Sequence, residues 1–417
     1  MKELLSVADA SARLLKCFSP VGSETLSITE AVGRVITHDV ISKIDLPAFN
    51  NSSMDGFAVR SADIKAASKE NPIELSIIAD IPAGKVIEST IKPGEAARIM
   101  TGAALPPGAD TVVPVEDTDQ FDELTRMNLP YRGIAKIFRS LQPGDYVRQK
   151  GEDINRGDIV LPSESKLRPQ DIGYLAMLGI PKASVYRKPR VAIFSTGDEL
   201  QQVGESLRPG KIYDSNAYTI SALVDREGGS PIYLGIAADE EQAIRDMFDV
   251  AVSQRADLIL STAGVSVGAF DYVRKIVEEY GRLSFWRVNM RPGKPILFGH
   301  MHDIPFFGLP GNPVSAFVGF EVFVRPALQK MIGIKEIQRP VVSVHLMEDV
   351  KSDGRESYLR VIVSPQDDRL VARLTGHQGS GNLLSLVQAN ALLIIPSGVK
   401  SLPIGSEVKA WLLEGVC

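Results

Sequence analysis

The stretch that decides the fold runs Asp257-Leu-Ile-Leu-Ser-Thr-Ala-Gly-Val-Ser-Val-Gly-Ala-Phe-Asp271. Its first residues form a short apolar run typical of a buried strand, and an amphipathic run at 272–280 follows it. A glycine- and hydroxyl-rich loop therefore connects a predicted strand to a predicted helix. Glycine lets the backbone approach a ligand closely, and a helix start offers unpaired N–H groups to an anion. Two interpretations of Asp271 stay open at this point: a helix cap or a metal ligand.

Residues 188–333 repeat the same alternation of strand and helix. This alternation predicts βαβ crossovers and a mainly parallel sheet, because parallel neighbours need a helical connection. The predicted strands are 191–194, 232–234, 258–260, 283–288 and 306–309. The predicted helices are 217–227, 240–254, 272–280 and 314–331.

The segments that flank residues 188–333 have different sequence patterns. Residues 6–18 have the spacing of an amphipathic helix, whereas residues 47–137 contain short β-like runs broken by Pro- and Gly-rich turns. A turn-rich segment then leads to a predicted helix at 169–178, and the tail from Val341 is typical of short strands. The residues alone leave open whether the β-rich domain is inserted into the N-terminal one.

Composition limits the class of protein. A length of 417 residues exceeds one ordinary domain, and 44% apolar with 23% charged residues fits a globular protein with a substantial core. A net charge of −5 argues against nucleic acid or an anionic membrane as the main partner, and no apolar run reaches membrane-spanning length. Cys17 and Cys417 form no metal or redox spacing, and the N-terminus lacks a signal-peptide core, so we expect a cytoplasmic protein.

Five polar or glycine-rich segments follow the five predicted strands. Ligands of open parallel sheets bind beyond the C-terminal ends of the strands, so these segments should meet at one edge. The segments are 195–199, 237–240, 261–271, 291–295 and 308–315.

The residue types in these segments suit a phosphorylated substrate. Glu199, Asp239 and Asp271 are oxygen ligands of the kind that Mg²⁺ accepts, and Arg291 and Lys294 suit phosphate or another oxyanion. Helix capping is the alternative for the carboxylates, mainly for Asp239, and a solvated loop is the alternative for the two basic residues.

Other site classes lack their motifs. Neither a Gly-x-Gly-x-x-Gly after a strand nor a Walker-type Gly-x-x-x-x-Gly-Lys-Ser/Thr occurs, and no Gly-x-Ser-x-Gly elbow is present. None of the five histidines has a metal-ligand spacing.

Taken together, four of these segments resemble the MoeA proteins and the gephyrin E domain. They are Ser195-Thr-Gly-Asp-Glu-Leu, Ser261-x-Ala-Gly-Val-Ser-Val-Gly-x-x-Asp-Tyr, Arg291-Pro-Gly-Lys-Pro and Gly308-Leu-Pro-Gly-Asn-Pro-Val-Ser. Asn51-Ser-Ser-Met-Asp-Gly-Phe-Ala-Val, Arg98-Ile-Met-Thr-Gly-Ala and Gly376-His-Gln-Gly-Ser380 extend the resemblance over essentially the whole chain. These relatives are molybdopterin molybdenumtransferases, which perform the last step of molybdenum-cofactor synthesis.

The resemblance implies a multidomain α/β plus β fold. An elongated N-terminal α+β domain at 1–45 and 141–180 would be interrupted by an inserted β-rich domain at 46–140. A MogA-like α/β domain at 181–334 and a C-terminal β-barrel at 335–417 would follow. The resemblance also implies a homodimer whose cleft combines the α/β domain of one subunit with the inserted domain of the other.

The implied reaction cleaves the pyrophosphate of adenylylated molybdopterin, releases AMP and inserts molybdate at the dithiolene, with Mg²⁺ as cofactor. The implied catalytic residues are Asp55, Glu199, Asp239 and Asp271, of which the last three are also the implied metal ligands. The implied substrate-binding residues are Thr101, Gly264, Ser266, Gly268, Arg287, Arg291, Lys294, Pro310 and Pro313. Molybdate would bind to Lys294, Ser315, Arg360 and Ser380, with Arg355 as the alternative to Arg360.

Two other activities remain as hypotheses at this stage. One is the adenylyltransferase activity of MogA-type proteins, against which the inserted domain and the barrel argue; such an adenylyltransferase is also a candidate partner. The other is a non-catalytic scaffold role like gephyrin's receptor clustering, against which the full set of acidic residues argues. One departure concerns Arg287 and Arg291, where many relatives carry lysine, because a planar guanidinium favours bidentate contacts.

Overall fold

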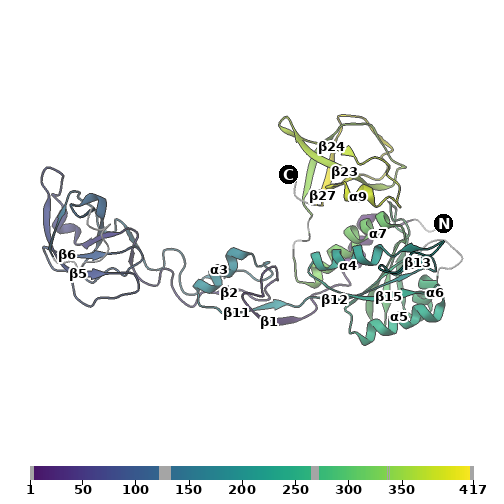
Figure 1. Cartoon of the computed structure of the whole chain (residues 1–417), viewed down its shortest axis with the longest axis horizontal. Helices are drawn as coiled ribbons and strands as arrows, with labels where there is room; N and C mark the ends of the chain where they lie inside the picture. Colours follow the sequence, from purple (N-terminus) through teal and green to yellow (C-terminus); the bar gives the residue numbers. More distant parts are fainter. Residues whose placement is uncertain (1–3, 122–132, 264–271, 336, 338, 414–417) are drawn as a thin grey trace. The chain divides into compact units, whose positions relative to one another are not determined.

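The computed structural model describes residues 4–121, 133–263, 272–335, 337 and 339–413. It consists of two compact units (Figure 1). The first unit comprises Met1–His38, Glu164–Gly173 and Pro181–Cys417, and the second comprises Asp39–Ser163 and Tyr174–Ile180.

The first unit contains a six-stranded sheet in the order β15-β12-β16-β20-β19-β17. All neighbours are parallel except the two pairs that involve β19, so the other five strands point the same way. The mainly parallel sheet is therefore confirmed, whereas β19 was missing from the predicted strands. The bounds are β12 Arg190–Thr196, β15 Ser230–Ala237, β16 Leu258–Thr262, β17 Arg282–Trp286, β19 Leu297–Met301 and β20 Ile304–Leu309.

Helices cover both faces of this sheet (Figure 1). One face packs against α4 (Asn216–Arg226) and the helical segment after β20, and the other packs against α5 (Glu241–Ser253) and α6 (Tyr272–Tyr280). Successive residues of a strand point to opposite faces, so Ile193 belongs to the first core and Phe194 to the second. The three layers hold the C-terminal ends of the strands at a common edge.

The prediction of one regular helix at 314–331 is wrong in its middle. The segment forms α7 (Pro313–Gly319), a π-helix at Phe320–Val324 and α8 (Arg325–Met331). Pro326 has no N–H to give to the preceding turn, and a local π-helix accommodates that loss. The predicted N-terminal helix is α1 (Val7–Leu15), and Ser6 caps it by accepting a 3.0 Å hydrogen bond from the Asp9 N–H.

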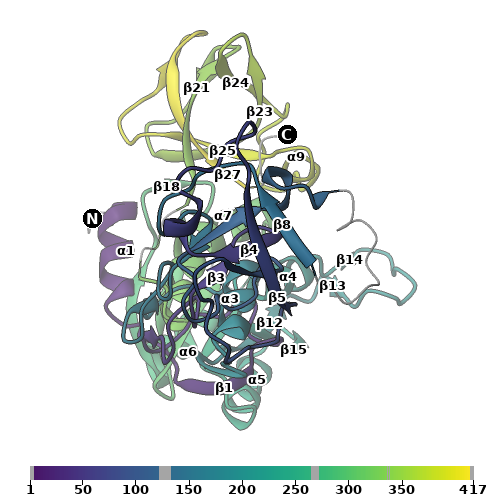
Figure 2. The ribbon, with the colours of Figure 1, turned by 90° about the vertical axis from the view of Figure 1, so that its left-hand side faces the viewer.

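The C-terminal part of the first unit is a closed barrel (Figure 2). Its sheet runs β18-β23-β24-β21-β27-β25, and β25 also pairs with β23, which closes five strands on themselves. The short β18 (Met290–Arg291) pairs in parallel with β23 and so ties the loop after β17 to the barrel. The remaining bounds are β21 Val341–Leu346, β22 Val350–Lys351, β23 Glu356–Gln366, β24 Arg369–Leu374, α9 Leu384–Val387, β25 Ala391–Ile395, β26 Ser401–Leu402 and β27 Glu407–Leu412.

The second unit is built on a five-stranded sheet in the order β7-β4-β6-β5-β8. Gly56 in β4 lies so close to β7 that a Cβ there would be 2.0 Å from the Val113 carbonyl oxygen. The bounds are β3 Asn51–Ser52, β4 Gly56–Val59, η1 Ser61–Ile64, β5 Ile73–Ile81, β6 Glu95–Ile99, β7 Thr111–Pro114, η2 Val115–Asp117, β8 Gly133–Ile137 and β9 Val147–Arg148.

Two strand pairs join chain that precedes the β-rich segment to chain that follows it. In the first unit β1 (Ser23–Ser27) pairs with β11 (Lys182–Tyr186), and in the second β2 (Val40–Ile41) pairs with β10 (Ile159–Leu161). Helix α3 (Pro169–Met177) lies between β10 and β11 in the chain, at the predicted position.

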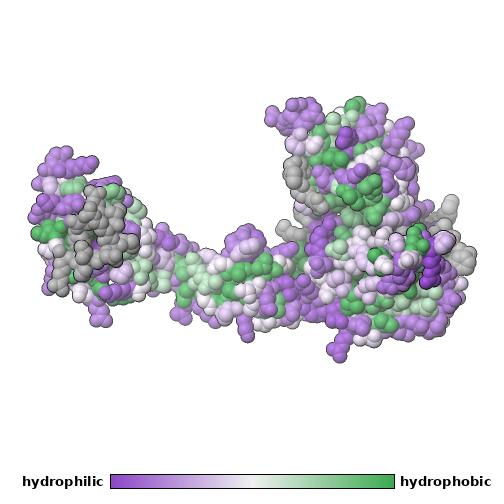
Figure 3. Space-filling model, viewed as in Figure 1, coloured by the Kyte–Doolittle hydropathy of each residue, from purple (hydrophilic) through white to green (hydrophobic). Residues whose placement is uncertain are grey.

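Hydrophilic residues dominate the surface of each unit in the view of Figure 3, with scattered apolar patches. Among the described residues, no helix is both long and apolar enough to span a membrane.

Candidate functional site

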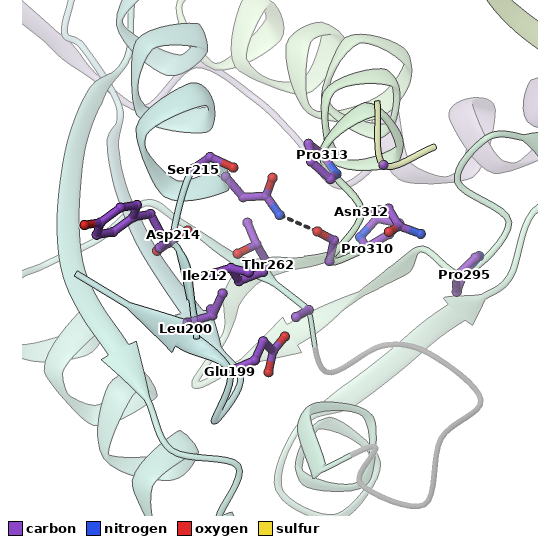
Figure 4. A pocket seen from close by; sticks show the side chains of 15 residues that line it. Glu199, Leu200, Ile212, Asp214, Ser215, Thr262, Pro295, Pro310, Asn312 and Pro313 are labelled. Atoms are coloured by element: carbon purple, nitrogen blue, oxygen red, sulfur yellow. Dashed lines mark hydrogen bonds between the residues drawn. The ribbon is translucent and has the colours of Figure 1, made fainter. Parts of the chain in front are cut away.

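A cavity of about 530 Å³ lies at the C-terminal ends of β12, β16 and β20. Figure 4 shows Glu199 and Thr262 on one side of this hollow and Pro310, Asn312 and Pro313 on the other. Four of the predicted strand-end segments, 195–199, 261–271, 291–295 and 308–315, therefore contribute residues to its lining. We call it the acidic cavity; its lining also includes Leu200, Ile212, Tyr213, Asp214, Ser215, Asn216, Ala263, Pro295, Gly311 and Gly381.

Glu199 reaches this cavity from the turn after β12. Gly197 in that turn has φ +145°, and a Cβ there would lie 2.6 Å from Glu199 Oε2. Glycine at 197 therefore both permits the backbone conformation and leaves room for the Glu199 carboxylate.

Asp239 follows β15 and lies beside the same turn. Its N–H donates to Asp198 Oδ1 over 3.3 Å. Burial raises the pKa of Asp239, and the charges of Asp198 and Glu199 raise it further. Helix α5 has Glu240 as its N-cap, so capping does not account for Asp239. The structure thus places three carboxylates close enough to repel one another.

The donor set here is made of oxygen atoms. The buried hydroxyl of Ser261, in β16, has no hydrogen-bond partner within the described chain, and the buried hydroxyl of Thr196, at the end of β12, lies beside Asp239. The described residues contain no group of three or more His, Cys, Asp or Glu positioned to hold a metal. Mg²⁺ commonly takes one or two carboxylates and keeps several waters, so Glu199 and Asp239 fit a hard cation in kind.

A second cavity, of about 330 Å³, adjoins the first and shares Pro295, Pro310 and Asn312 with it. It lies between the strand-end loops of the α/β sheet and the barrel. Four cationic side chains line it, which makes it the basic cavity: Arg291, Lys294, Arg355 and Arg360. The structure thus brings together all four residues predicted to bind molybdate, because Ser315 and Ser380 line it as well. Both of the alternatives, Arg355 and Arg360, are present.

Arg360 on β23 is fully buried. Its Nε donates to Ser385 Oγ at 3.0 Å, and its Nη2 donates to the Gly379 carbonyl at 3.1 Å. The Gln378 side chain forms two hydrogen bonds with the Arg360 backbone: its Oε1 accepts from the Arg360 N–H at 2.9 Å, and its Nε2 donates to the Arg360 carbonyl at 3.1 Å. Burial lowers the pKa of Arg360 to about 10, and the positive charge of Arg291 contributes to that shift. The guanidinium is therefore held in one orientation and partly deprived of water.

Arg287 lines neither cavity. Its guanidinium carbon lies 3.7 Å from the centre of the Trp286 ring, and that of Arg274 lies 3.9 Å from the same centre. Two guanidiniums at these distances must occupy opposite faces of the indole, a cation–π arrangement. The structure therefore places Arg287 in a stack with Trp286, apart from the residues that line the cavities.

Asp55 and Thr101 meet in the second unit. Asp55 Oδ1 accepts two hydrogen bonds of 2.7 Å, one from the Thr101 N–H and one from Thr101 Oγ1. Both residues are exposed, so the pair presents a carboxylate of defined orientation at the surface. Four predicted site residues, Gly264, Ser266, Gly268 and Asp271, lie outside the described residues.

Comparisons with known proteins agree along the length of the chain. Residues 5–179 match the MoeA N-terminal region (domains I and II), 192–330 a probable molybdopterin binding domain, and 343–413 the MoeA C-terminal region (domain IV). A molybdopterin molybdenumtransferase of Nostoc sp. is 39% identical over 400 residues, which are 94% of this chain and 89% of that protein. The chain belongs to the MoeA family.

Other MoeA-family members support the same conclusion. A Bacillus subtilis molybdopterin molybdenumtransferase is 35% identical over 412 residues, covering 97% of this chain and 94% of that protein. The crystal structure of a molybdopterin biosynthesis MoeA protein from Pyrococcus horikoshii superposes on this chain with a TM-score of 0.83. It shares 31% identity and covers 99% of this chain and 100% of that one. The family resemblance read from the sequence is confirmed.

Sequence reasoning missed several polar residues of this MoeA site. Asn216 donates through Nδ2 to the Gly311 carbonyl at 2.7 Å, a bond drawn in Figure 4 that links α4 to the loop after β20. The buried Asp214 accepts from the Ala217 N–H at 3.1 Å and from the Tyr233 hydroxyl at 3.2 Å. The polar triplet 214–216 before a helix was a signal for these positions, but it has the form of an ordinary capping sequence.

Proposed function

We propose that this MoeA-family protein is a molybdopterin molybdenumtransferase that cleaves adenylylated molybdopterin, releases AMP and transfers molybdate to the dithiolene. The observation that carries the proposal is the adjacency of the acidic cavity and the basic cavity along a shared wall. A substrate that joins a pterin dithiolene to a nucleotide through pyrophosphate needs a cleavage centre next to an oxyanion site.

The basic cavity supplies the oxyanion site of this proposal. Lys294 and Arg360 would bind molybdate, and the Ser315 and Ser380 hydroxyls would replace part of its hydration shell. Arg360 needs little reorganisation because Ser385 and Gly379 already hold its guanidinium. Arg291 and Arg355 complete the positive charge.

The acidic cavity supplies the cleavage centre. Glu199 and Asp239 would hold Mg²⁺ together with Asp271, or orient the attacking water. The cation, when bound, offsets negative charge that develops on the pyrophosphate. Pro310 lines both cavities and Pro313 lines the acidic one, and both are proposed substrate contacts. Thr101 and Arg287 are proposed substrate contacts as well, although Arg287 lies outside both linings and would have to reach the substrate from its stack with Trp286.

A direct assay tests this function. The purified protein is mixed with adenylylated molybdopterin, Mg²⁺ and molybdate, and AMP is quantified by chromatography. We expect AMP release by the wild type, its loss in Glu199→Gln, and full activity in Glu205→Gln. The control removes the same charge from an exposed side chain of the loop between β13 (Leu200–Gln201) and β14 (Ile212–Tyr213). Undiminished AMP release by Glu199→Gln would remove that residue from the mechanism.

A second arm separates this function from the adenylyltransferase alternative. Molybdopterin, Mg²⁺ and ATP are supplied without any adenylylated substrate. Formation of adenylylated molybdopterin in this arm would show that the chain performs the MogA-type reaction instead. If the proposal is right, a separate adenylyltransferase must supply the substrate.

We also propose a homodimer in which Asp55 of one chain serves the site of the other. The exposed, doubly hydrogen-bonded carboxylate supports a role outside the fold of its own unit. Mixing inactive Asp55→Asn with inactive Glu199→Gln should restore about a quarter of the wild-type activity per site if chains exchange at random, on the statistics of symmetric dimers. Absence of recovery in mixed dimers that are shown to form would place Asp55 and Glu199 in the same chain's site.

A further inference from the structure

One carboxylate lies at the rim of the basic cavity. Asp353 lies in the loop between β22 and β23, two residues before Arg355. We propose that Asp353 is an internal anion that competes with the substrate oxyanion for Arg291 and Arg355, and so sets how tightly the cavity holds that oxyanion. The inference rests on the proposed function in one respect: it takes a tetrahedral oxyanion as the ligand of the basic cavity.

Asp353 engages both arginines through one oxygen. Its Oδ2 accepts from Arg355 Nη2 at 2.5 Å and Nε at 3.0 Å, and lies 3.8 Å from Arg291 Nη1. Its Oδ1 accepts from the Arg355 N–H at 3.1 Å, so the loop backbone fixes the carboxylate. Arg355 also donates through Nη1 to the Met290 carbonyl at 3.2 Å. The Asp353 carboxylate therefore occupies the Nε and Nη2 donors of Arg355, which are also the donors that arginine offers to an oxyanion.

The other two cations of the cavity are in a different state. Neither Lys294 nor Arg360 forms an ion pair with any described residue. Asp353 therefore divides the four cations into two that are already paired and two that are available. A bound dianion finds Lys294 and Arg360 without a carboxylate partner, whereas full use of Arg291 and Arg355 requires that they give up contacts with Asp353.

Competition between Asp353 and the oxyanion for these arginines would help the oxyanion to leave the cavity during transfer. An oxyanion that is bound must later leave for the dithiolene sulfurs, and binding that is equally strong before and during transfer does not speed the chemical step. The Asp353 pairs are partly exposed, with side-chain exposures of 30–42%. Pairs of this kind shift equilibria modestly, so together they should weaken oxyanion binding by roughly 3- to 10-fold.

Calorimetric titration of the full chain with molybdate, and separately with sulfate, tests the proposal without any pterin. Asp353→Asn keeps an acceptor for the Arg355 N–H but removes the charge; we expect Kd for both anions to fall roughly 3- to 10-fold. The gain should shrink as salt is raised, because exposed charges are screened. Asp368→Asn, which removes the same charge beyond the far end of β23, should leave Kd unchanged. Asp353→Ser serves as a second charge-removing variant if the first does not fold.

The outcomes separate this inference from the function beneath it. Equal Kd in wild type and both Asp353 variants, with binding lost in Lys294→Ala, would overturn the role of Asp353 and leave the oxyanion cavity standing. Weaker binding in the Asp353 variants would overturn it as well. If the wild type binds neither anion, or if Lys294→Ala binds both as the wild type does, the oxyanion cavity of the proposed function falls, and this inference with it.

Discussion

Thr101 donates two hydrogen bonds, from its backbone N–H and from Oγ1, to the same carboxylate oxygen of Asp55, and each has a donor–acceptor distance of 2.7 Å. The backbone bond comes from the turn that follows β6, whereas the hydroxyl bond depends on the Thr101 side chain. An exposed carboxylate would otherwise sample several rotamers, and two bonds to one oxygen select one of them. No described residue donates a hydrogen bond to the second oxygen of Asp55, so that oxygen can face solvent or a ligand.

Removal of the Thr101 hydroxyl should disable this orientation without unfolding the unit. Thr101→Val keeps the shape and the backbone donor, and we expect AMP release to fall about tenfold, the scale of one hydrogen bond to a charged group. Thr101→Ser should keep most of the activity because it retains the hydroxyl. The AMP-release rates of the two variants, measured at equal folded fraction by circular dichroism, test this expectation; equal losses would show that the hydroxyl alone does not determine the activity.

Gly56 should tolerate no side chain. A Cβ at this position would lie 2.0 Å from the Val113 carbonyl oxygen, and backbone cannot move aside as a flexible side chain can. We expect Gly56→Ala to lower the free energy of unfolding by about 1–3 kcal/mol, as overpacking does, measured by urea denaturation. Gly84→Ala is a control for the strain of substituting a glycine: Gly84 has φ +83° and nothing within 4 Å of its Cβ position. A Gly56→Ala protein as stable as wild type would contradict the strand spacing described above.

Ser385 should matter through Arg360. Ser385→Ala removes the acceptor of a buried guanidinium N–H, which costs about 1–3 kcal/mol of stability. We also expect weaker molybdate binding, because the guanidinium loses its fixed orientation. Ser385→Thr keeps the oxygen and should rescue molybdate affinity more than stability. Calorimetric Kd and urea unfolding on the same preparations separate the two effects, and wild-type Kd in Ser385→Ala would exclude a positioning role.

We expect the Asp239 carboxylate to lower the stability of the protein without Mg²⁺ and to be necessary for AMP release. Its raised pKa means that the folded chain binds its proton more tightly than the unfolded chain does. That contribution to stability is present below the unfolded pKa and is lost as pH rises through the raised folded pKa. Asp239→Asn should therefore be stabilised at neutral pH by less than about 1 kcal/mol, the scale of a partly exposed charge pair, while AMP release is abolished.

The same variant links the carboxylates to the cation. Added Mg²⁺ should raise the melting temperature of the wild type, because a ligand that binds only the folded state stabilises it. It should leave Asp239→Asn unchanged. Thermal melts at several pH values with and without Mg²⁺ test both statements, and a wild type whose stability rises with pH across this titration would reverse the expected sign.

The alternation of strands and helices was determined by the sequence itself. Apolar runs such as 258–260 recur between amphipathic runs. A strand–helix–strand crossover of this kind joins parallel strands and places its helix on a face of the sheet. The motifs were equally local: glycine, proline and carboxylate at fixed spacing identified the MoeA family and most of the residues that line the two cavities. The alternation of strands and helices did not reveal β19 (Leu297–Met301), because no helix separates this strand from its antiparallel partner β20.

Only the tertiary structure decided which charges meet. Closure of the barrel and pairing of β18 with β23 bring Arg291 to Arg355 and Arg360, which are far from it in sequence. The same packing places Asp353 beside Arg291 and Arg355. It stacks Arg287 on Trp286, outside both cavities. It also brings Asp198 close enough to Asp239 to raise the pKa of that carboxyl. Sequence spacing specifies which residues lie at the strand ends. Distances between side chains of different elements depend on long-range packing, which local patterns do not encode.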